Sequence, residues 1–374
     1  MYRVTCIRNY HQITDLHDEW QRLQSICADS WPFNSWEWCV TWFRYFGEDR
    51  KPFVLLVRKA GKMIGLWPLM MSTQDIGIGI KLRRLQFVGY RKDFRWNDCM
   101  DILAVEDEKA NVIEQGLRFL HGYRYHWDQL DLWDIPETSM TIEVLKETAR
   151  RYSWYLEVAE NAVCPYVTTN KVDWEEYQKS RVKSARGDIG RQKKRLQKIG
   201  DLKVIYFYGE DIQKRLPFLF NMHKNRWAHT NTPSIFERDA QHKDFYRAIG
   251  SIFFPEHLTL MELQLNGEPI ASHFGFVWKR RLCYMTPVFD WNYCNYSPGK
   301  ILNYEIIKYG FENDHIDIID FQRGAEAYKY DWATSKLHVY HIVLWSPVRR
   351  IRSLLRLRTY PEVIKARMRR IFRL

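Results

Sequence analysis

The alternation of hydrophobic and polar positions divides the first half of the chain into helical and strand segments. Apolar side chains at a spacing of three to four predict a helix over residues 14–30, and Ser35 is placed to cap a second helix that ends at Gly47. Two apolar runs on either side of a turn at 59–62 predict a β-hairpin over residues 53–69. Further strands are expected at 85–88, 100–104 and 129–133, and helices at 109–120 and 139–152.

The second half repeats this order of elements. Strands are predicted at 258–265, 269–278 and 282–289, with Asn266-Gly267 as a two-residue hairpin turn, and a helix follows at 301–311. The turn glycines Gly61 and Gly267 are each followed, three residues later, by an apolar residue and a small residue. A duplicated unit explains this pattern. Two unrelated hairpins would give the same local signature, so the pattern alone leaves both interpretations open.

Length and composition limit the class of protein. A chain of 374 residues is expected to form two domains, and its 16 Trp and 22 Tyr are typical of cores and ligand clefts. The seven cysteines form no C-x-x-C pair, which argues against a zinc site or a disulfide framework and favours reduced thiols in a cytoplasm. We see neither a signal peptide nor an apolar run of membrane-spanning length. A cytoplasmic protein without a metal is therefore expected.

The net charge of +12 is concentrated in two segments. Residues 346–374 hold ten Lys and Arg but one acid, Glu362, and mix them with aliphatic residues. This tail is predicted to be a basic amphipathic helix in which residues 347–374 bind an anionic membrane surface; an ordinary docked surface helix is the alternative. Residues 179–198 hold nine Lys and Arg but one acid, Asp188. That second segment predicts either a solvated basic helix or a basic rim that attracts an anionic donor or acceptor.

The strongest local candidate for chemistry is the run Asn295-Tyr296-Ser297-Pro298-Gly299-Lys300. It lies between a predicted strand and a predicted helix, where free backbone N–H groups and the helix dipole suit a pyrophosphate. Gly299 permits close approach of the backbone, and Lys300 adds a positive charge. The alternative is plain helix capping, with Ser297 as the N-cap and Pro298 at the first helical position.

A second candidate lies within residues 318–332, where a short apolar strand runs into ionisable and aromatic residues. Asp320, Arg323, Glu326 and Lys329 could orient an acceptor there, or form a structural ion-pair loop. His273, on a predicted strand, is either a core histidine or a general base. The sequence contains no G-x-S-x-G elbow, Walker A loop, H-E-x-x-H motif or dinucleotide fingerprint.

Several motifs, in this order, resemble those of one known family. They are Phe33-Asn34-Ser35-Trp36-Glu37-Trp38, Gly61-Lys62-Met63-Ile64-Gly65, Asp98-Cys99-Met100-Asp101, Cys164-Pro165-Tyr166, Tyr296-Ser297-Pro298-Gly299-Lys300, and Asp320-Phe321 through Tyr328-Lys329-Tyr330-Asp331-Trp332. The chain resembles the GNAT-fold acyltransferases associated with cellulose or exopolysaccharide biosynthesis. These are relatives of the tandem-GNAT enzymes that add amino acids to peptidoglycan precursors.

The resemblance implies an α/β (α+β) fold of two tandem GNAT-like domains, each a mixed, mostly antiparallel sheet flanked by helices. We place the domains at residues 1–165 and 166–345, with the donor site in the second and the basic tail at 346–374. The two halves would face each other across a cleft. The cytoplasm, or the inner face of the membrane, is the expected location.

The resemblance also implies that an acyl group moves from acyl-CoA to an amine or hydroxyl of a carbohydrate or other acceptor. An envelope polysaccharide, its precursor or a lipid-linked sugar would fit. Residues 296–300 would hold the pyrophosphate, although they depart from the usual Q/R-x-x-G-x-G/A loop, and Asp320, Glu326 or His273 would be the base. The alternatives are an aminoacyl-tRNA donor and a non-catalytic module that binds a glycan or, less favoured, RNA.

Overall fold

The computed structural model describes the chain except for residues 29, 76–80, 92–97, 182, 254–256 and 349–374. The chain forms two compact units that are not simple halves of the sequence. Unit 1 contains Met1–Trp36, Gly47–Asn161 and the segment from Tyr340 onward, and unit 2 contains Glu37–Phe46 and Ala162–Val339. The basic tail predicted at 346–374 lies, from residue 349 onward, outside the described residues.

Unit 1 is built on two groups of strands. Its elements are β1 (Tyr2–Ile7), α1 (Tyr10–Thr14), α2 (His17–Ile26), η1 (Pro32–Asn34), β2 (Lys51–Pro52), β3 (Val54–Lys59), β4 (Lys62–Trp67), β5 (Leu69–Asp75), β6 (Lys81–Phe87), β7 (Leu103–Ala104), η2 (Glu106–Glu108), α4 (Lys109–Gly122), β8 (Gln129–Pro136) and α5 (Met140–Arg151). One group has the order β1-β3-β4-β7 and is antiparallel, and the other has the order β2-β5-β6-β8. The long strands β9 (Tyr155–Thr168) and β15 (Ser335–Trp345) each begin in one unit and end in the other.

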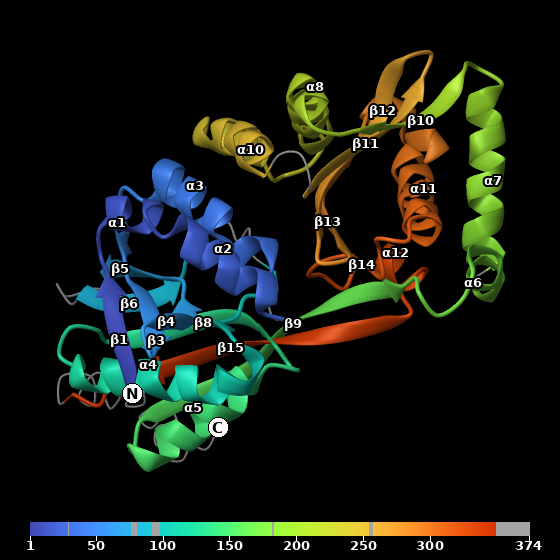
Figure 1. Cartoon of the computed structure of the whole chain (residues 1–374). Coiled ribbons are helices and arrows are strands. Elements are labelled where there is room, and N and C mark those ends of the chain that lie inside the picture. Colours follow the sequence, from blue (N-terminus) through green and yellow to red (C-terminus); the bar gives the residue numbers. More distant parts are fainter. Residues whose placement is uncertain (29, 76–80, 92–97, 182, 254–256, 349–374) are drawn as a thin grey trace, which may run out of the picture. The chain divides into compact units, whose positions relative to one another are not determined.

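Unit 2 holds the remaining elements (Figure 1). They are α3 (Trp36–Phe46), α6 (Trp174–Ser180), α7 (Lys183–Gln197), β10 (Leu202–Phe207), α8 (Glu210–Trp227), α9 (Ile235–Arg238), α10 (Gln241–Ile252), β11 (Leu258–Leu265), β12 (Glu268–Trp278), β13 (Arg281–Phe289), η3 (Trp291–Tyr296), α11 (Pro298–Glu312), β14 (Ile318–Asp320) and α12 (Ala327–Tyr330). The strand order is β10-β11-β12-β13-β14-β9, and only the β13–β14 pair among these is parallel.

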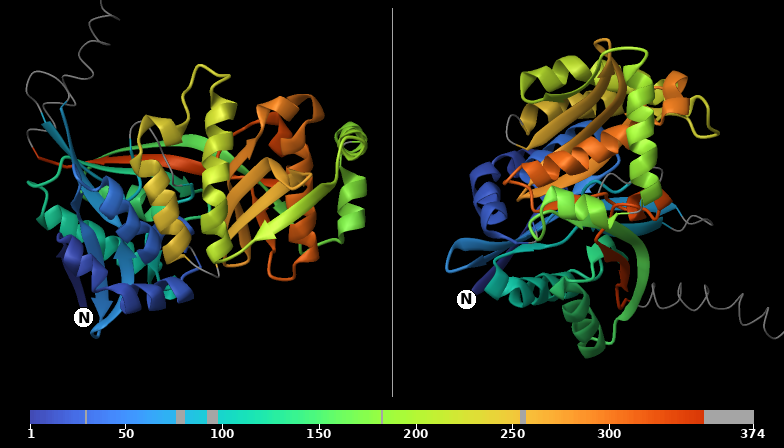
Figure 2. Two further views of the ribbon diagram at one scale, coloured as in Figure 1. Left: turned by 90° about the horizontal axis from the view of Figure 1, so that it is seen from above. Right: turned by 90° about the vertical axis from the view of Figure 1, so that its right-hand side faces the viewer.

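The two faces of the unit 2 sheet are covered by different helices (Figures 1 and 2). On one face, Tyr246 of α10 packs on Phe274 and shares a hydrogen bond of 2.7 Å with Thr286, and α8 packs beside it through Phe220. On the other face, apolar residues of α11 and α7 join those of the strands in one core, which contains Ile301, Ile306, Leu196, Ala271 and Leu282. Alternation along the strands separates the two sets of side chains.

Most of the predicted elements of the first half are present. The hairpin at 53–69 is confirmed as β3 and β4, the helix after Ser35 as α3, and the helices at 109–120 and 139–152 as α4 and α5. The helix predicted over 14–30 is present as the shorter α2, and a separate short helix, α1, precedes it. The strand expected at 100–104 pairs only at its end, as β7. Cys99 has a positive φ of 58°, which interrupts extended backbone.

Asp101, from the motif Asp98-Cys99-Met100-Asp101, is a buried structural group. Its carboxylate accepts hydrogen bonds from Lys109 Nζ at 2.8 Å, and from the hydroxyls of Ser139 and Thr141 at 2.7 Å each. The backbone N–H of Ile102 adds a fourth at 2.7 Å. A wholly buried charge needs such partners, so Asp101 fixes the start of α4 and α5 rather than facing a ligand.

The order of elements in unit 2 repeats that of unit 1. Strands β10-β11-β12-β13 correspond to β1-β3-β4-β7, and α11 follows β13 as α4 follows β7. In the β11–β12 turn, Asn266 and Gly267 have φ of 53° and 86°, as a two-residue hairpin turn requires. Within the described ranges, no helix combines the length and the apolar character needed to cross a membrane.

Candidate active site

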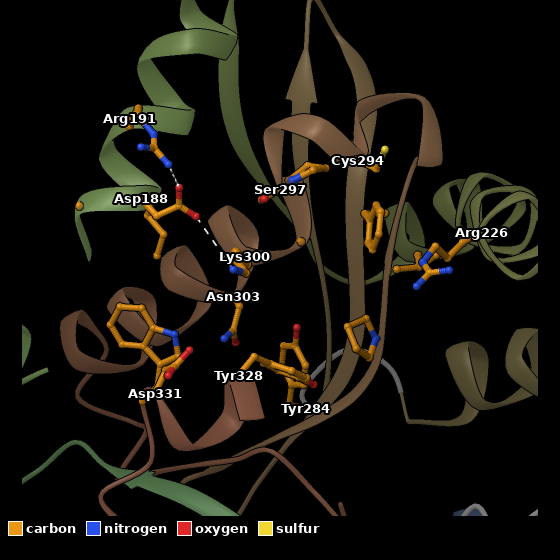
Figure 3. Close-up of a pocket in the computed structure, with 18 of the residues that line it drawn as sticks. Asp188, Arg191, Arg226, Tyr284, Cys294, Ser297, Lys300, Asn303, Tyr328 and Asp331 are labelled. Atoms are coloured by element: carbon orange, nitrogen blue, oxygen red, sulfur yellow. Dashed lines mark hydrogen bonds and ion pairs between the residues drawn. The ribbon is translucent and has the colours of Figure 1, made fainter. Parts of the chain in front are cut away.

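A cavity of about 950 Å³ lies in unit 2 beside the first turn of α11 (Figure 3). Four elements supply most of its wall: α7, the end of α8, β13 and the start of α11. The residues that line it are Gly187, Asp188, Ile189, Arg191, Arg226, Trp227, Thr230, Tyr284, Pro287, Val288, Phe289, Cys294, Ser297, Pro298, Gly299, Lys300, Asn303, Tyr328, Asp331 and Trp332. Many of these side chains are apolar or aromatic, as is usual in ligand sites.

The first turn of α11 presents a free amide to this cavity. Ser297 is the N-cap, but it adopts left-handed backbone angles (φ 51°, ψ 49°), and its hydroxyl makes no capping hydrogen bond. The N–H groups of Lys300 and Ile301 bond to the Ser297 carbonyl at 3.0 and 3.2 Å, and Pro298 has no N–H. Gly299 N–H is left without an acceptor in the described structure. Left-handed backbone at a serine costs on the order of 1–2 kcal/mol, and such strain concentrates at functional sites.

The edge of β13 is open next to this turn. β13 pairs with β14 only from Arg281 to Cys283, while the strand itself continues to Phe289. Between Cys283 and Thr286, β13 carries one residue more than its partner β12, which is a β-bulge. Backbone groups on the β14 side of β13, from Tyr284 onward, therefore face no strand within the described part of the chain. An extended ligand could take the place of a strand there.

Charged groups gather where α7 meets α11. The Asp188 carboxylate lies 2.5 Å from an Arg191 guanidinium nitrogen and 4.0 Å from Lys300 Nζ (Figure 3). Two cations thus share one carboxylate, and the wall keeps a net positive charge. Most of the basic segment at 179–198 is helical as α7, with Ile189 and Leu196 buried.

Two phenols and an amide line the inner wall. Burial raises the pKa of Tyr284 well above its ordinary value, and burial with the nearby Glu326 carboxylate raises the pKa of Tyr328 to about 12. Both hydroxyls therefore stay protonated at neutral pH and can donate hydrogen bonds. Asn303 is 2% exposed, and its Oδ1 has no hydrogen-bond partner. An unsatisfied buried acceptor on a cavity wall is a place for a ligand N–H.

Asp331 supplies a carboxylate to the same wall. It follows the last turn of α12 and lines the cavity with Tyr328 and Trp332. No ion pair or hydrogen bond to this carboxylate occurs in the described ranges. A carboxylate without a cation partner can accept a proton from an attacking amine or hydroxyl.

The residues proposed from the sequence fall into two groups. Ser297, Pro298, Gly299 and Lys300 line the cavity, and the ring of Tyr296, next to them, lies under the Arg195 guanidinium at 4.7 Å. The remaining candidates are absent from the cavity wall; they are Asp320, Glu326, His273, Arg323 and Lys329. The phosphate-binding role of residues 296–300 stays a prediction.

The residues off the wall occupy other environments. Asp320 is buried and accepts a hydrogen bond from Arg281 at 3.0 Å and from Gln322 N–H at 2.8 Å. His273 is wholly buried and stacks on the Tyr284 ring at 4.5 Å, and burial lowers its pKa to about 3. Neither ring nitrogen of His273 has a partner. These two groups support the wall from behind rather than reaching into the cavity.

Lys329 holds together the loop that follows β14. Its Nζ lies 2.8 Å from the Arg323 carbonyl oxygen, 3.3 Å from that of Gln322 and 2.9 Å from the Glu326 carboxylate. The lysine is 4% exposed. Because the Lys329 ammonium is buried and bonded to this loop, it fixes the conformation of the loop that precedes Tyr328.

Sequence reasoning included Tyr328 and Asp331 in its second candidate segment without giving them a role, and it missed Asn303 and Arg226. A signal existed for the first three: residues three or four apart share one face of a helix. Asn303 is four residues after Gly299, and Asp331 is three residues after Tyr328. Glu326 and Lys329, from the same segment as Tyr328, do not line the cavity. Arg226 comes from α8, which no sequence motif connected to the site.

Unit 1 lacks this electrostatic arrangement at the corresponding place. Between β7 and α4 stands η2, whose three residues are Glu106, Asp107 and Glu108. Lys109, the first residue of α4, is buried against Asp101. Carboxylates before a helix suit its dipole but repel phosphates. Unit 2 alone presents a phosphate-compatible turn at this position.

Comparisons with known proteins agree with the geometry. Residues 183–330 match the family model Acetyltransf_6, the Acetyltransferase (GNAT) domain. No curated protein matches the chain. Among solved structures, FemX is 9% identical with a TM-score of 0.59, over 90% of this chain and 96% of that chain.

Two further structures are similar at the level of the fold. The C-terminal domain (DUF2156) of a putative lysylphosphatidylglycerol synthetase from Agrobacterium fabrum is 11% identical with a TM-score of 0.57, over 93% of this chain and 96% of that chain. A conserved protein of unknown function from Bacteroides thetaiotaomicron VPI-5482 is 11% identical with a TM-score of 0.52, over 92% and 100%. The predicted fold class is confirmed, and the acetyltransferase (GNAT) match falls within unit 2, where it supports a transferase of the GNAT type. Among the described residues, no group of three His, Cys, Asp or Glu could hold a metal ion.

Proposed function

We propose that the protein is an acyl-CoA-dependent acyltransferase that acylates an amine or hydroxyl acceptor from unit 2. The observation that carries the proposal is the 950 Å³ cavity, which joins the first turn of α11 to the open edge of β13. GNAT domains in general bind acyl-CoA. The acceptors that the resemblance suggests, an envelope polysaccharide, its precursor or a lipid-linked sugar, belong to this proposal.

The donor would lie with its pyrophosphate at Gly299 and Lys300. The free Gly299 N–H and the positive end of a 15-residue helix attract anions, and Lys300 adds charge. A Cβ at Gly299 would come 3.3 Å from the Phe289 ring, so a larger residue would narrow this part of the cavity. The pantetheine arm would follow the open edge of β13, whose unpaired backbone groups match its amides.

The chemistry follows from the groups on the wall. The acceptor nitrogen or oxygen attacks the thioester carbonyl carbon, the carbon–sulfur bond breaks, and CoA leaves as the thiolate. Asp331 accepts the proton that the acceptor loses. Tyr328, protonated because its pKa is about 12, donates a hydrogen bond to the charge that develops on sulfur. Binding the acyl-CoA and the acceptor on one wall of the cavity removes the entropic cost of bringing the two reactants together in the reactive orientation.

Calorimetric titration with acetyl-CoA and longer acyl-CoAs tests the donor. Wild type should bind with saturation, and Gly299→Trp should lose binding because the indole fills the space beside Phe289. Gly190→Trp is the matched control: Gly190 is on α7 with open space around its Cβ and does not line the cavity. Release of free thiol in the presence of an acceptor amine then reports transfer.

An aminoacyl-tRNA donor is the second candidate, favoured by the basic residues of α7 such as Arg191 and Lys194. Under that alternative, wild type would fail to bind every acyl-CoA and would bind tRNA in a salt-dependent manner. The same binding pattern without any transfer would instead favour a non-catalytic module.

A further inference from the structure

Arg226 differs from the other cations of the cavity. It stands in the last turn of α8, half-buried, with its guanidinium 4.9 Å from the Phe289 ring centre and 4.8 Å from that of Trp291. Trp291 is in turn stacked on His229 at 4.7 Å. Figure 3 shows Arg226 on the other side of the cavity from Asp188 and Lys300. The rings hold the flat guanidinium in place and leave its N–H edges free.

This guanidinium has no counter-charge in the described part of the chain. Arg191 and Lys300 share the Asp188 carboxylate, whereas no carboxylate lies within ion-pair distance of Arg226 and none of its N–H groups makes a hydrogen bond. A partly buried charge is stabilised by an opposite charge, and five N–H donors remain to be satisfied. A ligand anion would supply both.

The position of Arg226 connects it to the acceptor. α8 and α11 cover opposite faces of the unit 2 sheet, and the cavity passes from one to the other beside the open edge of β13. With the donor phosphates at α11, the end of α8 borders the remaining entrance, together with Trp227 and Thr230. An acceptor that reaches the thioester from that side passes Arg226.

We propose that Arg226 binds an anionic group, a phosphate or a carboxylate, on the acceptor, and thereby selects acidic acceptors over neutral ones. This inference rests on the proposed function of the cavity. The planar fork of arginine matches either anion in a two-point hydrogen bond, and stacking on Phe289 and Trp291 sets its direction.

The test uses two amines that differ by one phosphate, glucosamine 6-phosphate and glucosamine. Each is titrated calorimetrically into the full-length protein saturated with CoA, so that the donor's phosphate site is filled. Wild type should bind the phosphorylated amine about ten-fold more tightly, as a charge-assisted hydrogen bond provides. Arg226→Gln should lower this preference to two-fold or less. Lys214→Gln, an exposed substitution at the other end of α8, should leave it unchanged.

Three results would overturn the inference. Equal binding of the two amines by wild type is one, and an unchanged preference in Arg226→Gln is another. The third is weaker binding of acetyl-CoA by Arg226→Gln with unchanged binding of 3′-dephospho-acetyl-CoA, which would assign the guanidinium to the donor. Acetyl-CoA affinity of wild type is measured first, so that failure of the proposed function is seen separately.

Discussion

Removing the ammonium of Lys329 tests whether this residue is structural or chemical. Lys329→Met keeps the length of the side chain and deletes three contacts of Nζ: 2.8 Å to the Arg323 carbonyl, 3.3 Å to that of Gln322 and 2.9 Å to Glu326. A buried hydrogen bond to a charged group contributes about 1.5–3 kcal/mol. The Glu326 side chain is 57% exposed, so its ion pair adds about 1 kcal/mol at most.

We expect Lys329→Met to lower the free energy of unfolding by about 2–4 kcal/mol. This is less than the sum of the three contacts, because the 3.3 Å hydrogen bond is weak and the variant no longer has to bury a charge. Denaturant unfolding at constant pH measures the difference. The two units can unfold in separate transitions, and the transition of unit 2 is the one that should move. Lys336→Met, on the exposed start of β15, is the control and should change stability by less than about 0.5 kcal/mol.

The opposite pattern would refute this reasoning. If Lys329→Met unfolded at the same denaturant concentration as wild type but turned over no acyl-CoA, the amine would take part in the chemistry. We expect instead that the folded variant still binds acetyl-CoA, since Gly299 and Lys300 are untouched, and that turnover falls only as far as the loop around Tyr328 loosens.

Two further predictions concern a proposed base and a buried histidine. Asp331→Asn should lower kcat for thiol release by about 10²–10⁴-fold and keep the affinity for acetyl-CoA within two-fold of wild type. The control Asp211→Asn, on the exposed start of α8, should change neither quantity. Full activity of Asp331→Asn would show that Asp331 is not the base. His273 has a pKa of about 3 in the folded protein against 6.5 for the free group, so the unfolded chain binds more protons between these values and stability falls as pH drops through that window. Between pH 6.5 and pH 5, protonation of this group in the unfolded chain should lower the unfolding free energy of wild type by about 2 kcal/mol. His273→Phe lacks this contribution, so its unfolding free energy should fall by about that much less over the same range. Equal decreases in the two proteins would show that His273 titrates normally.

The sequence predicted the strand, turn and helix that form the site better than it predicted which side chains line the cavity. Ser297-Pro298-Gly299-Lys300 could be placed between a strand and a helix because turn residues and the period of the apolar residues are local signals. The left-handed backbone of Ser297 is not such a signal, since serine rarely adopts it. The strain becomes visible only once η3 and α11 are packed against β13.

Side chains that meet from distant segments escaped prediction for a related reason. Arg226 and Phe289 are far apart in sequence, and only the packing of α8 on the sheet brings them together. Asp320 and His273 carry groups suited to catalysis, yet both lie behind the wall, because burial depends on neighbours that one sequence does not reveal. The short strand β14 likewise depends on pairing with β9 and β13 rather than on its own three residues.

Under the proposed function, the three acidic residues before α4 limit the number of donors that each chain can use. With Glu106, Asp107 and Glu108 at the place where unit 2 has Gly299 and Lys300, a nucleotide diphosphate meets repulsion in the first copy of the repeat and attraction in the second. If unit 2 binds acyl-CoA as proposed, the expected stoichiometry is one acyl-CoA per chain, although the repeated order of elements offers two helix entrances. The two corresponding helix entrances thus carry opposite charge, and the proposed function asks for thioester binding at only one of them.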